Sequence, residues 1–108
     1  MDDTAFDAEA SRTLQAIMDH VDEHLADGMD VDLQDGILTI ELEDGRVFIV
    51  NKHQPNRQIW LASPFSGASH YALDAATGRW VSTRSDADLL KLLGSELGKA
   101  AGADVDLG

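Results

Sequence analysis

The feature that most constrains the fold is a series of short alternating segments between residues 29 and 82. Met29, Val31 and Leu33 alternate with polar residues, which is the pattern of a half-buried strand. The dipeptides Asp35-Gly36 and Asp44-Gly45 are typical of tight hairpin turns. Strands are therefore predicted at 29–34, 37–42, 47–51, 58–62, 70–73 and 79–82. Because strands joined by such short turns must run antiparallel, this region predicts an antiparallel sheet of about five to six strands.

A helix is predicted before the strands, over residues 4–26. Apolar side chains recur there every three or four positions between Phe6 and Leu25, which is the spacing of one helical face. Thr4 or Asp3 is expected to cap the start of this helix. Gly28 is expected to end it in a left-handed conformation.

A second helix is predicted near the end of the chain, with Ser85 as its N-cap. Four leucines form its apolar stripe: Leu89, Leu92, Leu93 and Leu97. Gly98 and the 102–108 tail are expected to end it. The order helix, strands, helix predicts a single α+β domain over residues 1–108. It would be a two-layer sandwich with both helices packed on one face of the sheet.

Acidic residues are concentrated in the first part of the chain. Residues 1–44 contain 14 acids and a single base, Arg12, for a net charge of −13, whereas residues 45–108 have a net charge of +1. Such a surface repels nucleic acids and anionic membranes, so neither is expected as a partner, and cations or a basic protein surface are favoured. The absence of cysteine excludes disulfides and thiol chemistry by this chain's own side chains. Residues 1–25 lack the pattern of a secretory signal, so a cytoplasmic location is expected.

Six of the acids are expected to line one edge of the sandwich. Helical spacing groups Asp19, Asp22 and Glu23, and strand alternation puts Asp30 and Asp32 on one face. Together with Asp27 these residues form what we call the acidic ridge. Carboxylates suit Ca²⁺, Mg²⁺, Mn²⁺ and iron, and His20 and His24 could add imidazole. Because side chains on a convex stripe diverge, we expect weak, exchangeable binding and no closed cage.

The segment Asn51–Leu61, Asn-Lys-His-Gln-Pro-Asn-Arg-Gln-Ile-Trp-Leu, is the most distinctive motif. If Ile59 and Leu61 face the core, then Gln58 and Trp60 lie on the opposite, open face. An exposed Trp close to Gln58, Asn51 and Arg57 is typical of a protein-binding surface. The other tryptophan, Trp80, is predicted to pack in the core.

These motifs resemble the frataxin family of bacterial and mitochondrial iron–sulfur assembly proteins. The resemblance is carried by residues 51–61, by Ser63-Pro64 and Gly67 after them, by Asp-Gly-Ile-Leu-Thr-Ile at 35–40, and by Leu-Leu-x-x-Glu-Leu at 92–97. It covers nearly the whole chain.

The resemblance implies a role for each surface. The acidic ridge, with His20, would bind Fe²⁺ or Fe³⁺ weakly and dock on a basic patch of a cysteine desulfurase. Asn51, Gln58 and Trp60 would contact the desulfurase and an iron–sulfur scaffold protein. His70 stands in the same interface, where mitochondrial relatives carry Arg. The resemblance further implies no catalytic residues, and a bacterial-type monomer that metal could drive to oligomerise.

Two other functions are compatible with the acidic ridge. A ferroxidase or iron-storage enzyme could act on Fe²⁺ at the ridge, but a di-iron site needs Glu-x-x-His pairs on several helices, and the sequence contains none. An acidic DNA mimic would use the ridge, but this function does not explain the Asn51, Gln58 and Trp60 motif.

Overall fold

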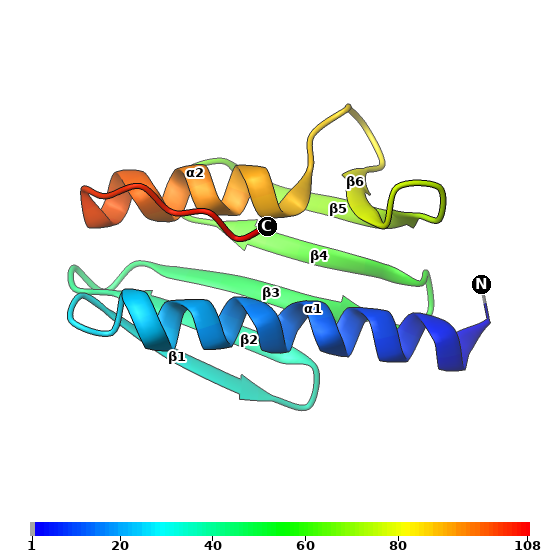
Figure 1. Ribbon diagram of the computed structural model, residues 1–108, viewed down its shortest axis with the longest axis horizontal. Helices are drawn as coiled ribbons and strands as arrows, with labels where there is room; N and C mark the ends of the chain where they lie inside the picture. The colour runs from blue at the N-terminus through cyan, green and yellow to red at the C-terminus, as the bar shows by residue number, and fades with distance from the viewer. Residues whose placement is uncertain (1) are drawn as a thin grey trace.

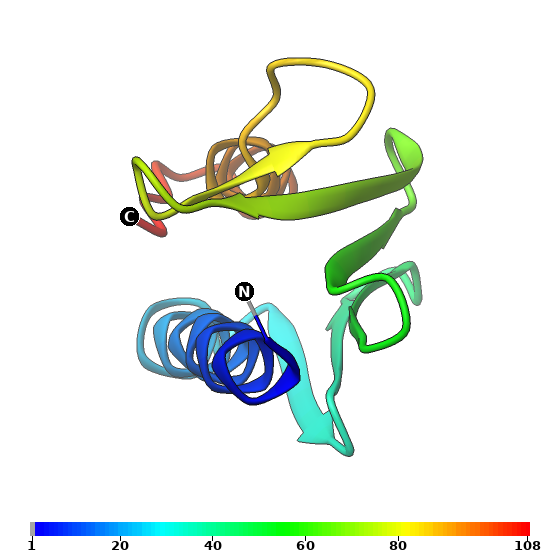
Figure 2. The ribbon, with the colours of Figure 1, turned by 90° about the vertical axis from the view of Figure 1, so that its right-hand side faces the viewer.

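The structure, a computed structural model that describes residues 2–108, has one layer of six strands and one layer of two helices (Figure 1). The elements in chain order are α1 (Asp3–His24), β1 (Met29–Gln34), β2 (Ile37–Leu42), β3 (Val47–His53), β4 (Gln58–Ser63), β5 (Gly67–Asp74), β6 (Arg79–Ser82) and α2 (Leu89–Ala101). Every neighbouring pair of strands is antiparallel, and their order in the sheet is the order in the chain. Seen end-on, both helices lie on the same side of a curved sheet (Figure 2). The predicted α+β sandwich is confirmed.

The core lies between the two layers. The largest fully buried side chains come from both helices and from β2 to β5: Phe6, Leu14, Ile17, Leu38, Ile40, Phe48, Ile59, Leu61, Tyr71, Leu89, Leu93 and Leu97. The alternating strand residues point to the other side of the sheet, which we call the open face. No helix in residues 2–108 has the length and apolarity needed to cross a membrane.

Trp80 joins the edge strand β6 to helix α1. It is 3% exposed, and its ring packs edge-on against Phe6 with 6.0 Å between the ring centres. Its indole N–H donates to the hydroxyl of Thr13 at 2.9 Å, which satisfies the one polar group of a buried side chain. The predicted core role of Trp80 is confirmed.

The first helix begins and ends earlier than its sequence suggests. Asp2 caps it, in place of Thr4 or Asp3, and accepts a hydrogen bond from the Ala5 amide at 2.7 Å. The C-cap is Leu25, with φ of −126°, so the prediction of a left-handed cap at Gly28 was wrong. The physical reason is that the chain needs residues 25–28 for the turn into β1, which the Gly28 amide closes by donating to the Leu25 carbonyl at 3.1 Å.

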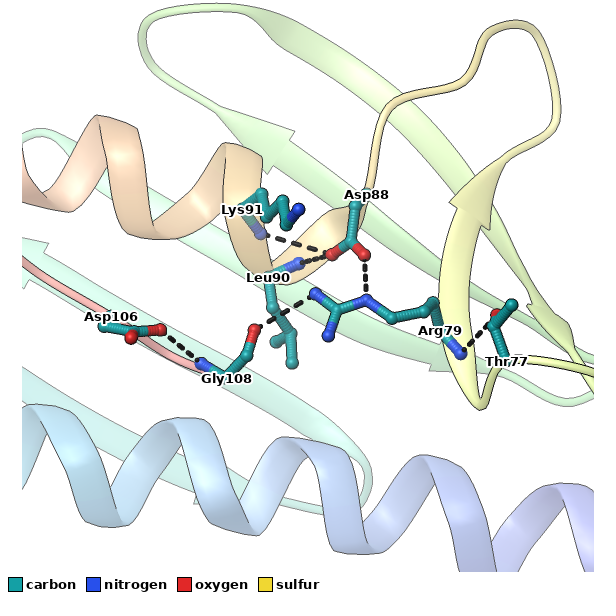
Figure 3. Close-up of polar contacts among 7 residues, drawn as sticks. All are labelled: Thr77, Arg79, Asp88, Leu90, Lys91, Asp106 and Gly108. Atoms are coloured by element: carbon teal, nitrogen blue, oxygen red, sulfur yellow. Dashed lines mark hydrogen bonds and ion pairs between the residues drawn. The ribbon is translucent and has the colours of Figure 1, made fainter.

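The second helix begins at Leu89, and its N-cap is Asp88 in place of Ser85 (Figure 3). One carboxylate oxygen of Asp88 accepts from the amides of Leu90 at 3.0 Å and Lys91 at 3.3 Å, and the other pairs with Arg79 on β6. Ser85 stays outside the helix because the chain after β6 first folds back beside it. In that segment the Ser82 amide donates to the Ala87 carbonyl at 2.8 Å.

Gly98 lies inside α2, so the prediction that it ends the helix was wrong; Gly102, with φ of 68°, is the C-cap. The tail after α2 runs back along the helix (Figure 1). A Cβ added to Gly98 would lie 2.7 Å from the Ala103 carbonyl oxygen, and one added to Gly94 would lie 3.1 Å from that of Val105. The two glycines therefore make room for the main chain of the tail.

We expect Gly98→Ala to lower the free energy of unfolding by about 1–2 kcal/mol, because the added methyl group overlaps main-chain atoms of the tail. In a chain shortened after Gly102 the same change should raise it by up to about 1 kcal/mol, because alanine favours helix over glycine. Urea denaturation of each Gly98→Ala variant and of its parent chain measures these free energies. A change of the same sign in both backgrounds would contradict the packing role.

Asp88 should also make stability depend on pH. Burial raises the pKa of its carboxyl, but the hydrogen bonds from Arg79 and from the Lys91 and Leu90 amides outweigh burial, so the pKa lies below its ordinary value. A lowered folded pKa gives stability that is present above the unfolded value of about 3.9 and is lost as pH falls through the folded value.

Asp88→Asn keeps a capping oxygen but removes the charge. The difference in unfolding free energy between the native chain and this variant should be constant above about pH 5 and shrink below about pH 4. Denaturant titrations across this range measure the difference. An unchanged difference in acid would show that the charge of Asp88 contributes nothing.

Candidate functional site

Three of the predicted partner-binding residues form one row across the open face of the sheet. Asn51 on β3 lies opposite Trp60 on β4, and Trp60 lies opposite His70 on β5. Gln58 precedes Trp60 by two residues on the same face, and its side-chain oxygen accepts the Trp60 indole N–H at 2.8 Å. The structure therefore brings all four residues together. His70 lies within β5, where the sequence predicts a strand over residues 70–73.

Trp60 is held between two histidines. The rings of His53 and Trp60 are stacked with centres 3.6 Å apart and planes 8° apart, and those of Trp60 and His70 with centres 4.2 Å apart and planes 11° apart. We call these three residues the imidazole–indole stack. It fixes the indole before a partner arrives, so less side-chain entropy is lost on binding. His53 was not among the predicted site residues, although it shares a face with Asn51 two positions earlier.

Apolar side chains extend this surface toward β2. Ile37 is 44% exposed and lies opposite Asn51, and Ile49 is 41% exposed and lies opposite Ala62. The middle of the open face therefore combines exposed aliphatic groups with an immobilised aromatic group. A centre of apolar and amide side chains that contains an aromatic anchor is typical of protein interfaces.

The six acids of the ridge are all exposed. Within residues 2–108, none of them has a Lys or Arg nitrogen within salt-bridge distance. The first half of α1 differs, because Asp3, Asp7 and Glu9 pair with Arg57, Lys52 and Arg12. On β1, Asp30 lies directly opposite Glu41, so like charges adjoin. The negative field is therefore strongest around the C-terminal end of α1 and along β1.

The ridge does not form a cage. In the part of the chain that the structure describes, no three Asp, Glu or His side chains are close enough to share one metal ion. Asp19 accepts a hydrogen bond from Gln15 at 2.9 Å, and the ring of His20 lies 4.6 Å from that of His24. Such an arrangement can offer one or two ligands to a hydrated cation and leave water in its other positions.

The basic residues of the central motif point away from the open face and hold the β3–β4 hairpin against α1. Arg57, with φ of 49° in the turn, donates to the Asp3 carboxylate at 2.8 Å, and Lys52 pairs with Asp7. The sequence predicts Arg57 beside Trp60 as a partner contact. The structure shows it bound to the first turn of α1.

Comparisons with known proteins agree with this architecture. The model of the frataxin-like domain family matches residues 1–103. The iron-sulfur cluster assembly protein CyaY of Thioalkalivibrio sulfidiphilus is 36% identical over 109 residues, covering 99% of this chain and 100% of that protein. Mitochondrial frataxin of Arabidopsis thaliana is 38% identical over 94 residues, covering 87% of this chain but only 50% of that longer protein.

Solved structures show the same fold. Frataxin from Psychromonas ingrahamii superposes with a TM-score of 0.88 at 31% identity and covers 100% of this chain and 99% of its own. A trimeric frataxin from the yeast Saccharomyces cerevisiae, complexed with ferrous iron, has a TM-score of 0.78 at 37% identity and covers 87% of this chain and 86% of its own.

Loss of the ion pairs between the β3–β4 hairpin and α1 should loosen the hairpin and leave the rest of the fold unchanged. We expect Asp3→Asn/Asp7→Asn to speed amide hydrogen exchange at Gln54, Asn56 and Arg57. The unfolding free energy should fall by less than about 1 kcal/mol per ion pair, because both pairs are partly exposed. Asp19→Asn/Asp27→Asn makes the same change in net charge without touching the hairpin. Equal exchange in the two variants would contradict the contact's role.

Proposed function

The chain belongs to the frataxin family, and on that premise we propose that it is a non-enzymatic accessory protein of iron–sulfur cluster assembly. It binds iron loosely and modulates a cysteine desulfurase–scaffold complex. The observation that supports this proposal is the juxtaposition of two exposed surfaces of opposite kind. One is the acidic ridge. The other is the middle of the open face around the imidazole–indole stack, where amide and apolar side chains lie. The cytoplasmic location expected from the sequence stays a prediction.

The acidic ridge is proposed to make the first contact with a basic patch on the desulfurase. In the described chain its carboxylates lack lysine and arginine partners, so their field reaches beyond the surface and speeds encounter with a positive partner. The Debye length is about 8 Å at physiological salt, so this contribution must weaken as salt is added.

The same ridge is proposed to carry iron as cargo. Carboxylate oxygens are ligands for ferrous and ferric ions, and His20 adds an imidazole to them. An ion held by one or two side chains keeps most of its water and exchanges readily, which suits delivery to another protein. An iron-bound trimer has been solved for yeast frataxin. For this chain we propose a monomer that associates only when metal is present.

The open face is proposed to supply specificity at short range. Trp60 lies between the two imidazoles. Its indole cannot rotate without breaking the hydrogen bond to Gln58. Asn51 and Gln58 offer amide groups beside it, and Ile37 and Ile49 offer apolar area. A fixed aromatic group surrounded by amides is the kind of centre on which binding energy concentrates.

Charge reversal tests the ridge. Asp22→Lys/Glu23→Lys should abolish binding to the purified desulfurase, measured by pull-down at low salt and by calorimetry, while circular dichroism shows the fold intact. Asp86→Lys/Asp104→Lys is the matched control, because it makes the same change in net charge at exposed acids outside the ridge. Unchanged affinity of the ridge variant, or equal losses in both, would refute this docking role.

Trp60→Ala tests the open face in the same assay. It should weaken binding by at least about tenfold at every salt concentration, because the lost contact is not electrostatic. Ala62→Ser, an exposed change on the same strand, is the control.

Oxygen consumption with excess Fe²⁺ distinguishes the ferroxidase alternative from the proposed accessory role. Sustained turnover that is lost when the six ridge acids become amides would favour an enzyme.

A further inference from the structure

The two histidines of the imidazole–indole stack differ in their surroundings. Within residues 2–108, Nδ1 of His53 is the one buried side-chain nitrogen or oxygen that has no hydrogen-bond partner. His70 has no such buried nitrogen, so its ring nitrogens stay in reach of water. The ring of His53 also lies nearer to Trp60, with 3.6 Å between ring centres against 4.2 Å for His70. One imidazole is therefore closed off at one nitrogen, and the other is not.

A proton added to the His53 ring has no acceptor while the ring is stacked. A neutral imidazole carries one N–H group, whereas the protonated ring carries an N–H on both nitrogens. With Nε2–H as its single donor, the neutral ring leaves only a lone pair at the buried Nδ1. The protonated ring must place an N–H there without an acceptor, and a buried donor that is also charged costs more than a buried lone pair. Protonation therefore opposes the stacked position of His53.

We propose that protonation of His53 releases its ring from Trp60, so that the stack holds the indole ready for docking only while His53 is neutral. Histidine changes charge between about pH 5 and pH 8, so modest changes in acidity can operate such a switch. The consequence for docking rests on the proposed function, because it concerns regulation of the same face. The release itself is a property of the free chain and needs no partner.

Attraction between a cation and the indole does not hold a protonated His53 in place. A cation over an aromatic face gains electrostatic energy from the ring. Here both faces of Trp60 are occupied, so two protonated imidazoles would repel each other across one indole. His70, whose nitrogens reach water, can take up a proton and remain stacked. A further proton on His53 then adds this repulsion to the cost of the buried N–H.

No charged group on the elements beside His53 makes an ion pair with it in residues 2–108. Across the sheet it faces Gln58, whose side-chain oxygen already accepts the indole N–H. The charged groups of the hairpin and of the start of α1 are bound to one another, as the pairs Lys52–Asp7 and Arg57–Asp3. On the β2 side, the exposed Asp35 precedes Gly36, whose carbonyl accepts the Lys52 amide at 2.8 Å. Asp35 is beyond salt-bridge distance of the stacked ring, so it can receive the imidazolium only after release.

The surroundings of His70 also lack an acidic partner. Its carbonyl accepts the Thr83 amide at 2.9 Å, and the exposed Arg84 follows Thr83 in the chain. Asp74 lies four residues further along β5, opposite Arg79 on β6. In the described part of the chain, no ion pair involves His70. His70 therefore exchanges its proton with water and serves as an internal comparison for His53.

Release of His53 should weaken docking by the open face. The stack fixes the indole before a partner arrives, and after release only His70 and the hydrogen bond to Gln58 hold it. The indole then gains freedom that binding must remove again. Full affinity belongs to the fraction of chains whose His53 ring is in place. Docking is therefore expected to weaken as pH falls through the range in which His53 takes up a proton.

NMR spectra of the free chain, recorded between about pH 8 and about pH 5, test the release. At the higher pH the rings of both histidines should show nuclear Overhauser contacts with the Trp60 indole. As the His53 ring becomes protonated, its contacts with Trp60 should disappear, whereas those of His70 should persist. Contacts between His53 and Trp60 that persist while the His53 ring carries both protons would overturn the proposal.

Docking to the purified desulfurase tests the consequence, with calorimetry of the native chain and of His53→Phe at about pH 8 and about pH 5.5. Phenylalanine can stack on the indole but cannot take up a proton. The weakening of affinity at the lower pH should be at least about threefold greater for the native chain than for the variant. His20, His24 and the partner's own groups are the same in both measurements, so their contributions cancel in this comparison. Equal weakening in both chains would overturn the proposal.

A second variant, His53→Gln, removes both the ring and its charge. It should lose the same pH-dependent part of the affinity, whatever its affinity at the higher pH, and it replaces His53→Phe if circular dichroism shows that variant unfolded. Failure of the native chain to bind the desulfurase at either pH would refute the proposed docking function. The spectra of the free chain decide the release of His53 in either case.

Discussion

Burial of one face of the sheet under two helices is the constraint on which the rest of this structure depends. Leu38, Ile40 and Val50 must face the helices, so the residues between them must face away. A shift of one residue in the pairing of β3 with β4 would exchange Trp60 for Ile59. The same packing that makes the core therefore also places Trp60, Asn51 and Gln58 on the open face.

The distribution of charge follows from a second constraint, the position of the few basic residues. Arg57 and Lys52 lie at the end of the sheet where α1 begins, so they neutralise the acids of its first two turns. In the described chain the ridge acids at the other end of the helix have no such partners. The result is one helix with a neutralised start and a strongly negative end. That end is the helical part of the acidic ridge.

The periodic elements and the surfaces that they carry were predictable from the sequence. Strand alternation predicted that Trp60 and Gln58 leave the core, and the hairpin dipeptide at Asp35-Gly36 takes up the expected left-handed conformation at both residues, with φ of 53° and 77°. The helix ends were less predictable. Serine and aspartate are equally favourable N-cap residues, so residue type does not choose between Ser85 and Asp88. The choice of Asp88 depends on the return of the chain beside β6 and on the ion pair between Asp88 and Arg79.

The sequence by itself determined the class of fold, the register of the open face and the location of the negative charge, because each depends on spacing along the chain. Only the tertiary structure decided which side chains meet across strands and between layers. It brought His53 and His70 onto the two faces of Trp60, bound Arg57 to Asp3, and seated the tail on Gly98. These contacts are made between strands, between the two layers or between a helix and the tail, so they depend on how the elements pack, which no local pattern encodes.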